Sequence, residues 1–355
     1  PFVVGTSAAD STAAYTEIGT VDELIALMSD SSGWAGNYRL TDHIDLTGKD
    51  GQACIGNDTV PFTGIFDGNG KTVSGISLNI TGRKGVGFFG IVRDAEIRDL
   101  TVKGSVTSNA NFAGGLIGAI TGNVLVENCT SEIVVNAPSR VGGVVGGAYY
   151  SLNVTNCSNS GNVTGWRYCA GIVGNISSGS QPSTITGCVN TGSITAPSTC
   201  AAGIVSNLPN GCKVTACYNT GAIKAGGNYP AGIVGYCANS EVRSCFNLGT
   251  VTCNTTFTYG SVIGTVSSAD AVIKNLYYLE GTCEKGGIGA VKNAETQTAA
   301  VRTAEEIANA EFVSTMNADL AEAAFTSGCT ATKHPILLWQ ADAEHTFANT
   351  ASDVI

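Results

Sequence analysis

The stretch GVVGGAYYSLNVTNCSNSGNVTG (143–165) returns along the chain with changed side chains and almost unchanged spacing. Its opening tetrapeptide belongs to a series of apolar pairs flanked by small residues: GFFG (87–90), GLIG (115–118), GVVG (143–146), GIVG (171–174), GIVS (203–206), GIVG (232–235) and SVIG (261–264). Consecutive members begin 28 to 32 residues apart. A unit that returns at a nearly fixed period of this size is typical of a repeat protein, in which each unit packs on its neighbours.

Cysteine and asparagine also recur from unit to unit, after the apolar pairs and their flanking glycines, which we call the glycine pairs. One cysteine per unit lies at Cys129, Cys157, Cys188, Cys217 and Cys245, and an asparagine follows two residues later at Asn159, Asn190, Asn219 and Asn247. Leu100 and Leu276 take the place of the cysteine in the outer units, and leucine cannot form a disulfide. We therefore predict a structural ladder of buried thiols and an amide ladder at a turn.

The apolar clusters of each unit predict β-strands. They are too short for helices and rich in Val, Ile and Thr, and no helical stretch separates them. About three such strands per 28 residues predict an all-β fold, a parallel β-helix or β-solenoid, with the right-handed crossover that parallel strands favour. The open ends of a solenoid would polymerise by edge pairing, so we expect a short capping helix at each end.

Two capping boxes, Thr20 with Glu23 and Thr303 with Glu306, indicate where these helices begin. The expected organisation is an N-terminal tail or strand (1–19), a cap helix with the first coils (20–104), the repeat solenoid (105–280), and a C-terminal cap (281–355) containing a helix (303–324) and a closing strand (334–340).

Composition excludes several classes of function. Of the 355 residues, 46 are glycine and only 13% are charged, and the formal net charge is −10. Such a chain lacks the basic surface that binds nucleic acid, and no run approaches the roughly 20 apolar residues of a membrane-spanning helix. We therefore expect no nucleic-acid partner, no membrane span and no cofactor.

The repeat resembles the GLUG motif of bacterial surface proteins, named for its Gly-Leu-hydrophobic-Gly core, to which GLIG (115–118) corresponds closely. PFTGIFDGNGKTVSGI (61–76) and HPILLWQ (334–340) resemble the opening and closing segments of the same proteins. The resemblance implies a secreted or cell-surface module of a larger extracellular protein. GLUG units also accompany IgA-cleaving zinc peptidases, but this chain has no HExxH helix, so we predict no metal site.

Six aromatic residues are candidates for ligand binding. Three of them, Phe112, Tyr168 and Tyr229, lie three residues before the glycine of their units, and Trp166, Phe257 and Tyr259 lie close to the same position. Stacked coils would align them as a ledge of rings along a loop edge, where sugars or protein partners could dock. The alternative is that the rings merely shield that edge.

Cysteine pairing stays open. Thirteen cysteines cannot all pair within one chain. Cys169 and Cys200 lie in corresponding loops of adjacent coils, where a disulfide and two unpaired thiols are both compatible with the sequence.

Three functional hypotheses follow. The first is a non-catalytic extracellular module that acts in adhesion or in binding a host glycan or host protein. The second is a carbohydrate-active β-helix enzyme, a glycosidase or lyase, whose acids come from the N-terminal strands and include Asp45, Asp67, Asp94 and Asp99. The third is a structural spacer or filament subunit that self-associates. Residues 105–270 contain only four acids, which disfavours catalysis along the rod.

Overall fold

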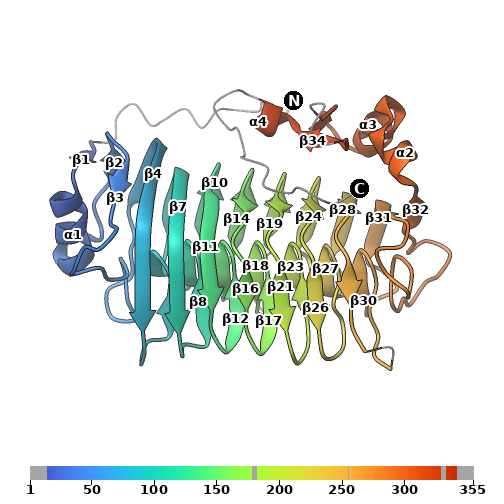
Figure 1. Ribbon diagram of the computed structural model, residues 1–355, viewed down its shortest axis with the longest axis horizontal. Helices are drawn as coiled ribbons and strands as arrows, with labels where there is room; N and C mark the ends of the chain where they lie inside the picture. The colour runs from blue at the N-terminus through green and yellow to red at the C-terminus, as the bar shows by residue number, and fades with distance from the viewer. Residues whose placement is uncertain (1–13, 178–181, 255, 329–332, 342–355) are drawn as a thin grey trace.

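The computed structural model describes residues 14–177, 182–254, 256–328 and 333–341. It shows an all-β chain wound into a parallel β-solenoid of about eight turns, with a few short helices. The coils stack along the long axis of the molecule, and the N-terminal helix lies at one end of the stack (Figure 1). The predicted fold class is confirmed.

Each central coil contributes strands to three parallel sheets. Sheet 1 contains the strands on either side of the cysteine register: β1 (Thr16–Ile18), β2 (Tyr38–Leu40), β3 (Ile44–Asp45), β4 (Ile65–Ile80), β7 (Ala95–Ser108), β10 (Val124–Glu127), β11 (Thr130–Asn136), β14 (Leu152–Thr155), β15 (Ser158–Asn159), β16 (Val163–Thr164), β19 (Thr184–Thr186), β20 (Val189–Asn190), β21 (Ile194–Ala196), β24 (Lys213–Thr215), β25 (Tyr218–Asn219), β26 (Ile223–Ala225), β28 (Glu241–Asn247), β29 (Val251–Thr252), β31 (Val272–Leu279) and β32 (Ala300–Arg302).

The other two sheets lie on either side of the glycine pairs. Sheet 2 comprises β5 (Gly85–Val86), β8 (Phe112–Gly114), β12 (Ser139–Gly142), β17 (Arg167–Ala170) and β22 (Ala201–Ala202). Sheet 3 comprises β6 (Phe89–Val92), β9 (Ile117–Ile120), β13 (Val145–Ala148), β18 (Val173–Ile176), β23 (Val205–Leu208), β27 (Val234–Cys237) and β30 (Ile263–Val266). Phe112 and Tyr168, for which the sequence suggested a loop edge, therefore lie in strands of sheet 2, whereas Tyr229, Phe257 and Tyr259 lie outside strands.

The five cysteines of the predicted ladder lie inside the solenoid, and all of them are buried free thiols. The backbone N–H of Cys129 lies 3.4 Å from Sγ of Cys157, and the same spacing joins Cys188 to Cys217 and Cys217 to Cys245. The thiols thus follow one another from coil to coil without covalent links.

We expect iodoacetamide at pH 8 to leave these five ladder cysteines unmodified in the folded protein. Burial raises the pKa of Cys129, Cys157, Cys188 and Cys245 above the ordinary value, which disfavours the reactive thiolate at these four positions. Against the effect of burial, hydrogen bonds from Cys188 and Cys245 lower the pKa of Cys217, and this thiol is protected because the core encloses it completely. Among the described cysteines, the half-buried Cys253 and Cys283 should react first. Peptide mass spectrometry reads each site, with the guanidinium-unfolded protein as the positive control. Ladder cysteines that react as fast as Cys253 would contradict this packing.

The four asparagines form a continuous buried amide ladder. Nδ2 of Asn159, Asn190 and Asn219 each donates to Oδ1 of the next asparagine, at 2.8, 2.7 and 2.7 Å. A Cβ atom placed on the first glycine of the facing pair, such as Gly143 or Gly171, would overlap the amide of Asn159 or Asn190. The two sequence registers are therefore parts of one core, because the glycine provides the space that the amide fills.

The N-terminal cap agrees with the sequence. Helix α1 (Val21–Ser29) begins at the capping box of Thr20 and Glu23, and it buries Leu24, Leu27 and Met28. A 3₁₀ turn, η1 (Ser31–Gly33), follows the helix.

The C-terminal segment differs from its prediction. The single helix expected over 303–324 is two helices, α2 (Ala304–Ala308) and α3 (Ala310–Asn317), because Asn309 adopts an extended backbone and caps α3 with its side chain. The strand expected over 334–340 is limited to β34 (Ile336–Leu337), which pairs antiparallel with β33 (Phe325–Thr326) and leads into α4 (Leu338–Ala341). This segment returns along the outside of sheet 1 (Figure 1).

Candidate functional site

The predicted aromatic residues share a register but do not form one ledge. Strand pairing in sheet 2 aligns Phe112, Arg140, Tyr168, Cys200 and Tyr229 in adjacent coils. Arg140 and Cys200 thus interrupt the rings. The guanidinium of Arg140 lies 5.0 Å from the ring centre of Phe112 and 5.9 Å from that of Tyr168.

The remaining predicted rings are dispersed. Tyr229 lies 5.9 Å from Tyr236 of sheet 3, and Tyr259 is buried in the core. Phe257 is half-buried, whereas Trp166 is 61% exposed at a corner of the coil. A ligand-binding role for these side chains stays a prediction, but a continuous stack of rings is not present.

Cys169 and Cys200 are both buried free thiols in the structure, so the disulfide that the sequence left open is not formed. Strand pairing explains this arrangement. Cys169 lies opposite Ala201, which places Cys200 one position earlier, beside Tyr168. Burial raises the pKa of Cys200 to about 11 and also raises that of Cys169, which keeps both thiols protonated.

Phe112 forms the floor of a pocket on the outside of sheet 3. Its ring packs against Ile91 and Ala119 of two adjacent strands. In the next strand Gly147 leaves room for it, because a Cβ atom there would lie 2.6 Å from Cδ1 of Phe112. The ring is consequently almost fully buried although it comes from an outward position.

Two tyrosines lie beside the Phe112 ring at this pocket. Tyr149 and Tyr150 directly follow β13 and are 45% and 51% exposed. The ring of Tyr149 lies 5.1 Å from that of Phe112 at an angle of 51°. Together with neighbouring polar groups the three aromatic residues enclose about 670 Å³, and we call this site the aromatic pocket.

Two cationic side chains line the polar side of the aromatic pocket, and only one of them forms an ion pair. Nζ of Lys84 lies 3.1 Å from a carboxylate oxygen of Asp58, so this charge is paired. Arg93 is exposed, and no carboxylate in the described part of the chain lies within ion-pair distance of its guanidinium. The residues that line the pocket therefore combine exposed rings with one positive charge, that of Arg93, which pairs with no described carboxylate.

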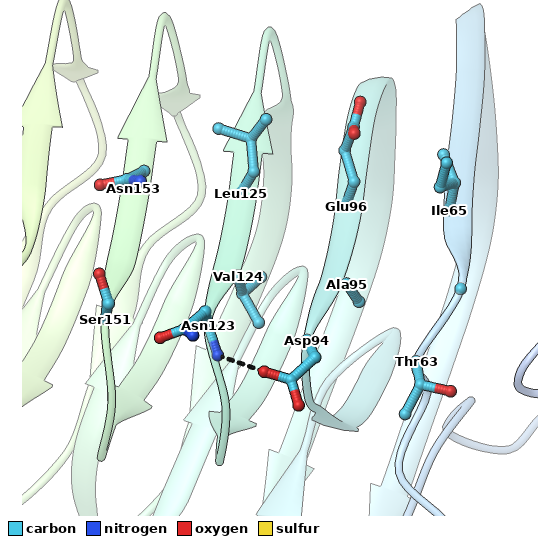
Figure 2. A pocket seen from close by; sticks show the side chains of 11 residues that line it. Thr63, Ile65, Asp94, Ala95, Glu96, Asn123, Val124, Leu125, Ser151 and Asn153 are labelled. Carbon is cyan, nitrogen blue, oxygen red and sulfur yellow. Dashed lines mark hydrogen bonds between the residues drawn. The ribbon is translucent and has the colours of Figure 1, made fainter. Parts of the chain in front are cut away.

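A second hollow of about 400 Å³ lies at the edge of sheet 1. Figure 2 shows Glu96, Leu125 and Asn153 at one level on neighbouring strands, with Asp94 below them. A carboxylate oxygen of Asp94 accepts a hydrogen bond of 2.9 Å from the backbone N–H of Asn123. Both polar and aliphatic side chains line this groove, and none of the lining residues is aromatic.

The acids of the enzyme hypothesis are engaged in local bonds. Asp67 is buried and accepts from Arg39 at 2.9 Å and from Arg98 at 3.3 Å. Asp99 accepts from the side chain of Asn128, and two hydrogen bonds from Thr47 lower the pKa of Asp45. These contacts explain the carboxylates as parts of the fold, and they provide no positive evidence of catalysis.

Glu127 has a different environment. Burial and the nearby carboxylates of Asp99 and Glu96 raise its pKa. In the described part of the chain, no three His, Cys, Asp or Glu side chains gather as a metal site around it or elsewhere.

These features define the class of protein, a parallel β-solenoid with an amide ladder in its core. Residues 137–164, one repeat of the central stack, match the family model described as "The GLUG motif". The chain therefore contains the GLUG motif, which confirms the resemblance inferred from the sequence.

Part of this chain is similar in sequence to a known protein. Halomucin of Haloquadratum walsbyi is 29% identical over 160 residues, which cover 42% of this chain and 2% of that protein. The chain thus spans a small fraction of this relative. No helix in the described ranges is long and apolar enough to cross a membrane.

Two solved structures share the fold. A Bacteroides ovatus chain titled "putative immunoglobulin A1 protease" is 18% identical with a TM-score of 0.56, and the match covers 92% of both chains. A chain titled "IgA1 Protease" is 13% identical with a TM-score of 0.58, and the match covers 95% of this chain and 26% of that one. At these identities the likeness shows the fold alone.

Tyr149, Tyr150 and Arg93 are not among the candidate binding residues predicted from the sequence. The available signal was the third glycine of GVVGGAYY, which departs from the units that place a larger residue at the position of Gly147. Phe112 belongs to sheet 2 and Gly147 to sheet 3, so their contact can be recognised only in the folded coil.

Proposed function

We propose that this chain is a non-catalytic extracellular module of a larger surface protein, and that it binds glycans in the aromatic pocket. The observation that carries the proposal is the pair of exposed tyrosines beside the buried ring of Phe112. The GLUG motif and the similarity to Halomucin support an extracellular surface location.

The chemistry of the aromatic pocket suits a sugar ring. An exposed aromatic face packs against the apolar C–H face of a pyranose, while polar groups at the margin hydrogen-bond its hydroxyls. The volume of about 670 Å³ is within the usual range for small-ligand sites and would hold one or two sugar units. Adhesion would then follow from many such modules in one long polypeptide, since multivalency multiplies a weak affinity.

Replacing Tyr149 or Tyr150 by alanine should weaken glycan binding by at least about tenfold, because each change removes a stacking surface worth roughly 1.4 kcal/mol or more. Glycan-array screening identifies the bound saccharides, and calorimetry measures their affinity for each variant. The matched control is Trp166→Ala, which removes another exposed aromatic ring that does not line the aromatic pocket.

The outcomes separate the hypotheses. If Trp166→Ala abolishes binding and the tyrosine variants retain it, the ligand occupies the predicted ledge and the aromatic pocket is wrong. Absence of any bound glycan would favour the structural spacer. Reproducible cleavage of a saccharide, lost in Glu127→Gln, would favour the enzyme, because Glu127 has the raised pKa that a general acid needs.

A further inference from the structure

We propose that the saccharide recognised in the aromatic pocket carries a carboxylate, as a uronic acid does, and that Arg93 binds this group. The inference rests on the proposed glycan-binding function and specifies its ligand class. It starts from the charge that the pocket leaves uncompensated.

Arg93 differs from Arg39 and Arg98, two other arginines of the first coils. Arg39 and Arg98 both bind the buried carboxylate of Asp67, and their charges are thereby neutralised. Arg93 is exposed and lines the aromatic pocket without such a partner in the described residues. Arg93 thus brings a guanidinium that pairs with no described carboxylate into the same pocket as the two exposed tyrosines.

The backbone and the next coil hold Arg93 in place. It directly follows β6, and its N–H donates to the carbonyl of Phe62 at 2.9 Å. The stem of its side chain lies over the adjacent turn, where a Cβ atom on Gly122 would come within 2.5 Å of Cγ of Arg93. Glycine at 122 therefore lets the stem run along the pocket wall, which reduces the entropy that Arg93 loses on binding.

A guanidinium recognises a carboxylate through two parallel hydrogen bonds, and the planar fork gives this pair its direction. A neutral sugar would meet the same rings but would leave Arg93 to water. Lys84 adds little to this preference because Asp58 already pairs with it. Discrimination between acidic and neutral sugars is thus assigned to one side chain.

The test compares tetrasaccharides of hyaluronan, polygalacturonate and alginate with their carboxyl-reduced counterparts, which keep the sugar ring and lose the charge. Calorimetry at 150 mM salt should show at least one acidic form bound about tenfold or more tighter than its reduced form. Arg93→Gln should bring that ratio close to one with the affinity for the reduced form unchanged, and Arg93→Lys should retain part of the ratio.

Arg167→Gln is the matched control, since it removes an equally exposed arginine beside Tyr168, outside the pocket. A ratio reduced as much by Arg167→Gln would show that long-range charge causes the preference, and it would overturn the assignment. Equal binding of acidic and reduced forms by the wild type would also overturn it and leave the glycan-binding function standing. If no saccharide is bound in either form or on the array, the proposed function itself fails.

Discussion

Asn219→Ala should lower the free energy of unfolding by about 4 kcal/mol, although the change removes only one small amide. The Asn219 side chain accepts from Asn190 at 2.7 Å and donates to Asn247 at 2.7 Å and to the carbonyl of Gly221 at 2.8 Å. The residue is fully buried, so water cannot replace these bonds without a local opening. Leaving a buried partner of a hydrogen bond unsatisfied costs about 1–3 kcal/mol. The cost per bond should lie in the lower part of this range, because Asn190 still donates to the carbonyl of Gly192 and Asn247 still accepts from the backbone N–H of Gly249.

Denaturant unfolding followed by circular dichroism measures this loss. The matched control is Asn136→Ala at an exposed strand position, which should stay within about 0.5 kcal/mol of the wild type. A cost below about 1 kcal/mol for Asn219→Ala would mean that the amides contribute no more than surface residues do. Because each coil stabilises mainly its neighbours, the strongest increase in amide hydrogen exchange is expected in the coils of β20, β25 and β28.

The stack of coils could be predicted from the sequence because its core repeats residue by residue. A cysteine and an asparagine recur at fixed positions in successive units. Coils stacked in register are the simplest arrangement that aligns the cysteines in one column and the asparagines in another. The sequence also shows that a glycine recurs in each unit, but only the folded coil shows that Gly143 faces the amide of Asn159 and leaves room for it.

Sheet 2 was harder to predict because its strands are only two to four residues long. Four residues of the column that these strands align, Arg140, Tyr168, Cys200 and Tyr229, have positive φ angles of 47° to 71°. That backbone conformation is uncommon for residues other than glycine, and no local propensity announces it. Placing the rings in a loop was therefore reasonable, but the ledge that followed was not continuous.

The aromatic pocket could not be predicted for a related reason. Its floor, its rings and its cation come from three different coils, and the sequence separations among Arg93, Phe112 and Tyr149 are not repeated elsewhere in the chain. Periodicity identifies what every coil shares, whereas this site depends on what a few coils do differently.

The surface of sheet 1 that the C-terminal segment covers also depends on residues that differ between coils. Strand pairing aligns Thr130, Ser158, Val189, Tyr218 and Phe246 on neighbouring strands of sheet 1, and this column changes from polar to apolar along the rod. The change was visible in the sequence as Tyr and Phe after the ladder cysteines. The side chains that cover it could not be inferred, because they lie more than 60 residues later in the chain.

Phe246→Ala should release this C-terminal segment from sheet 1 while the coils stay folded. The Phe246 ring is fully buried, stacks on Tyr218 at 5.0 Å, and lies 5.8 Å from both Phe312 and Phe325. These side chains form a core separate from the one inside the solenoid. Truncating a buried phenylalanine costs about 3–5 kcal/mol, which is comparable with the stability of so small a unit.

Limited trypsin digestion provides the first measurement, with rapid cleavage expected after Arg302 and Lys333 in the variant. Tryptophan emission provides the second, because Nε1 of Trp339 donates to the carbonyl of Gly187 at 2.9 Å and would enter water on release. Tyr236→Ala, a half-buried ring on sheet 3, is the matched control and should change neither signal. Loss of the strand signal in circular dichroism together with the cleavage would show instead that segment and coils unfold as one unit, since a separate core must be able to open alone.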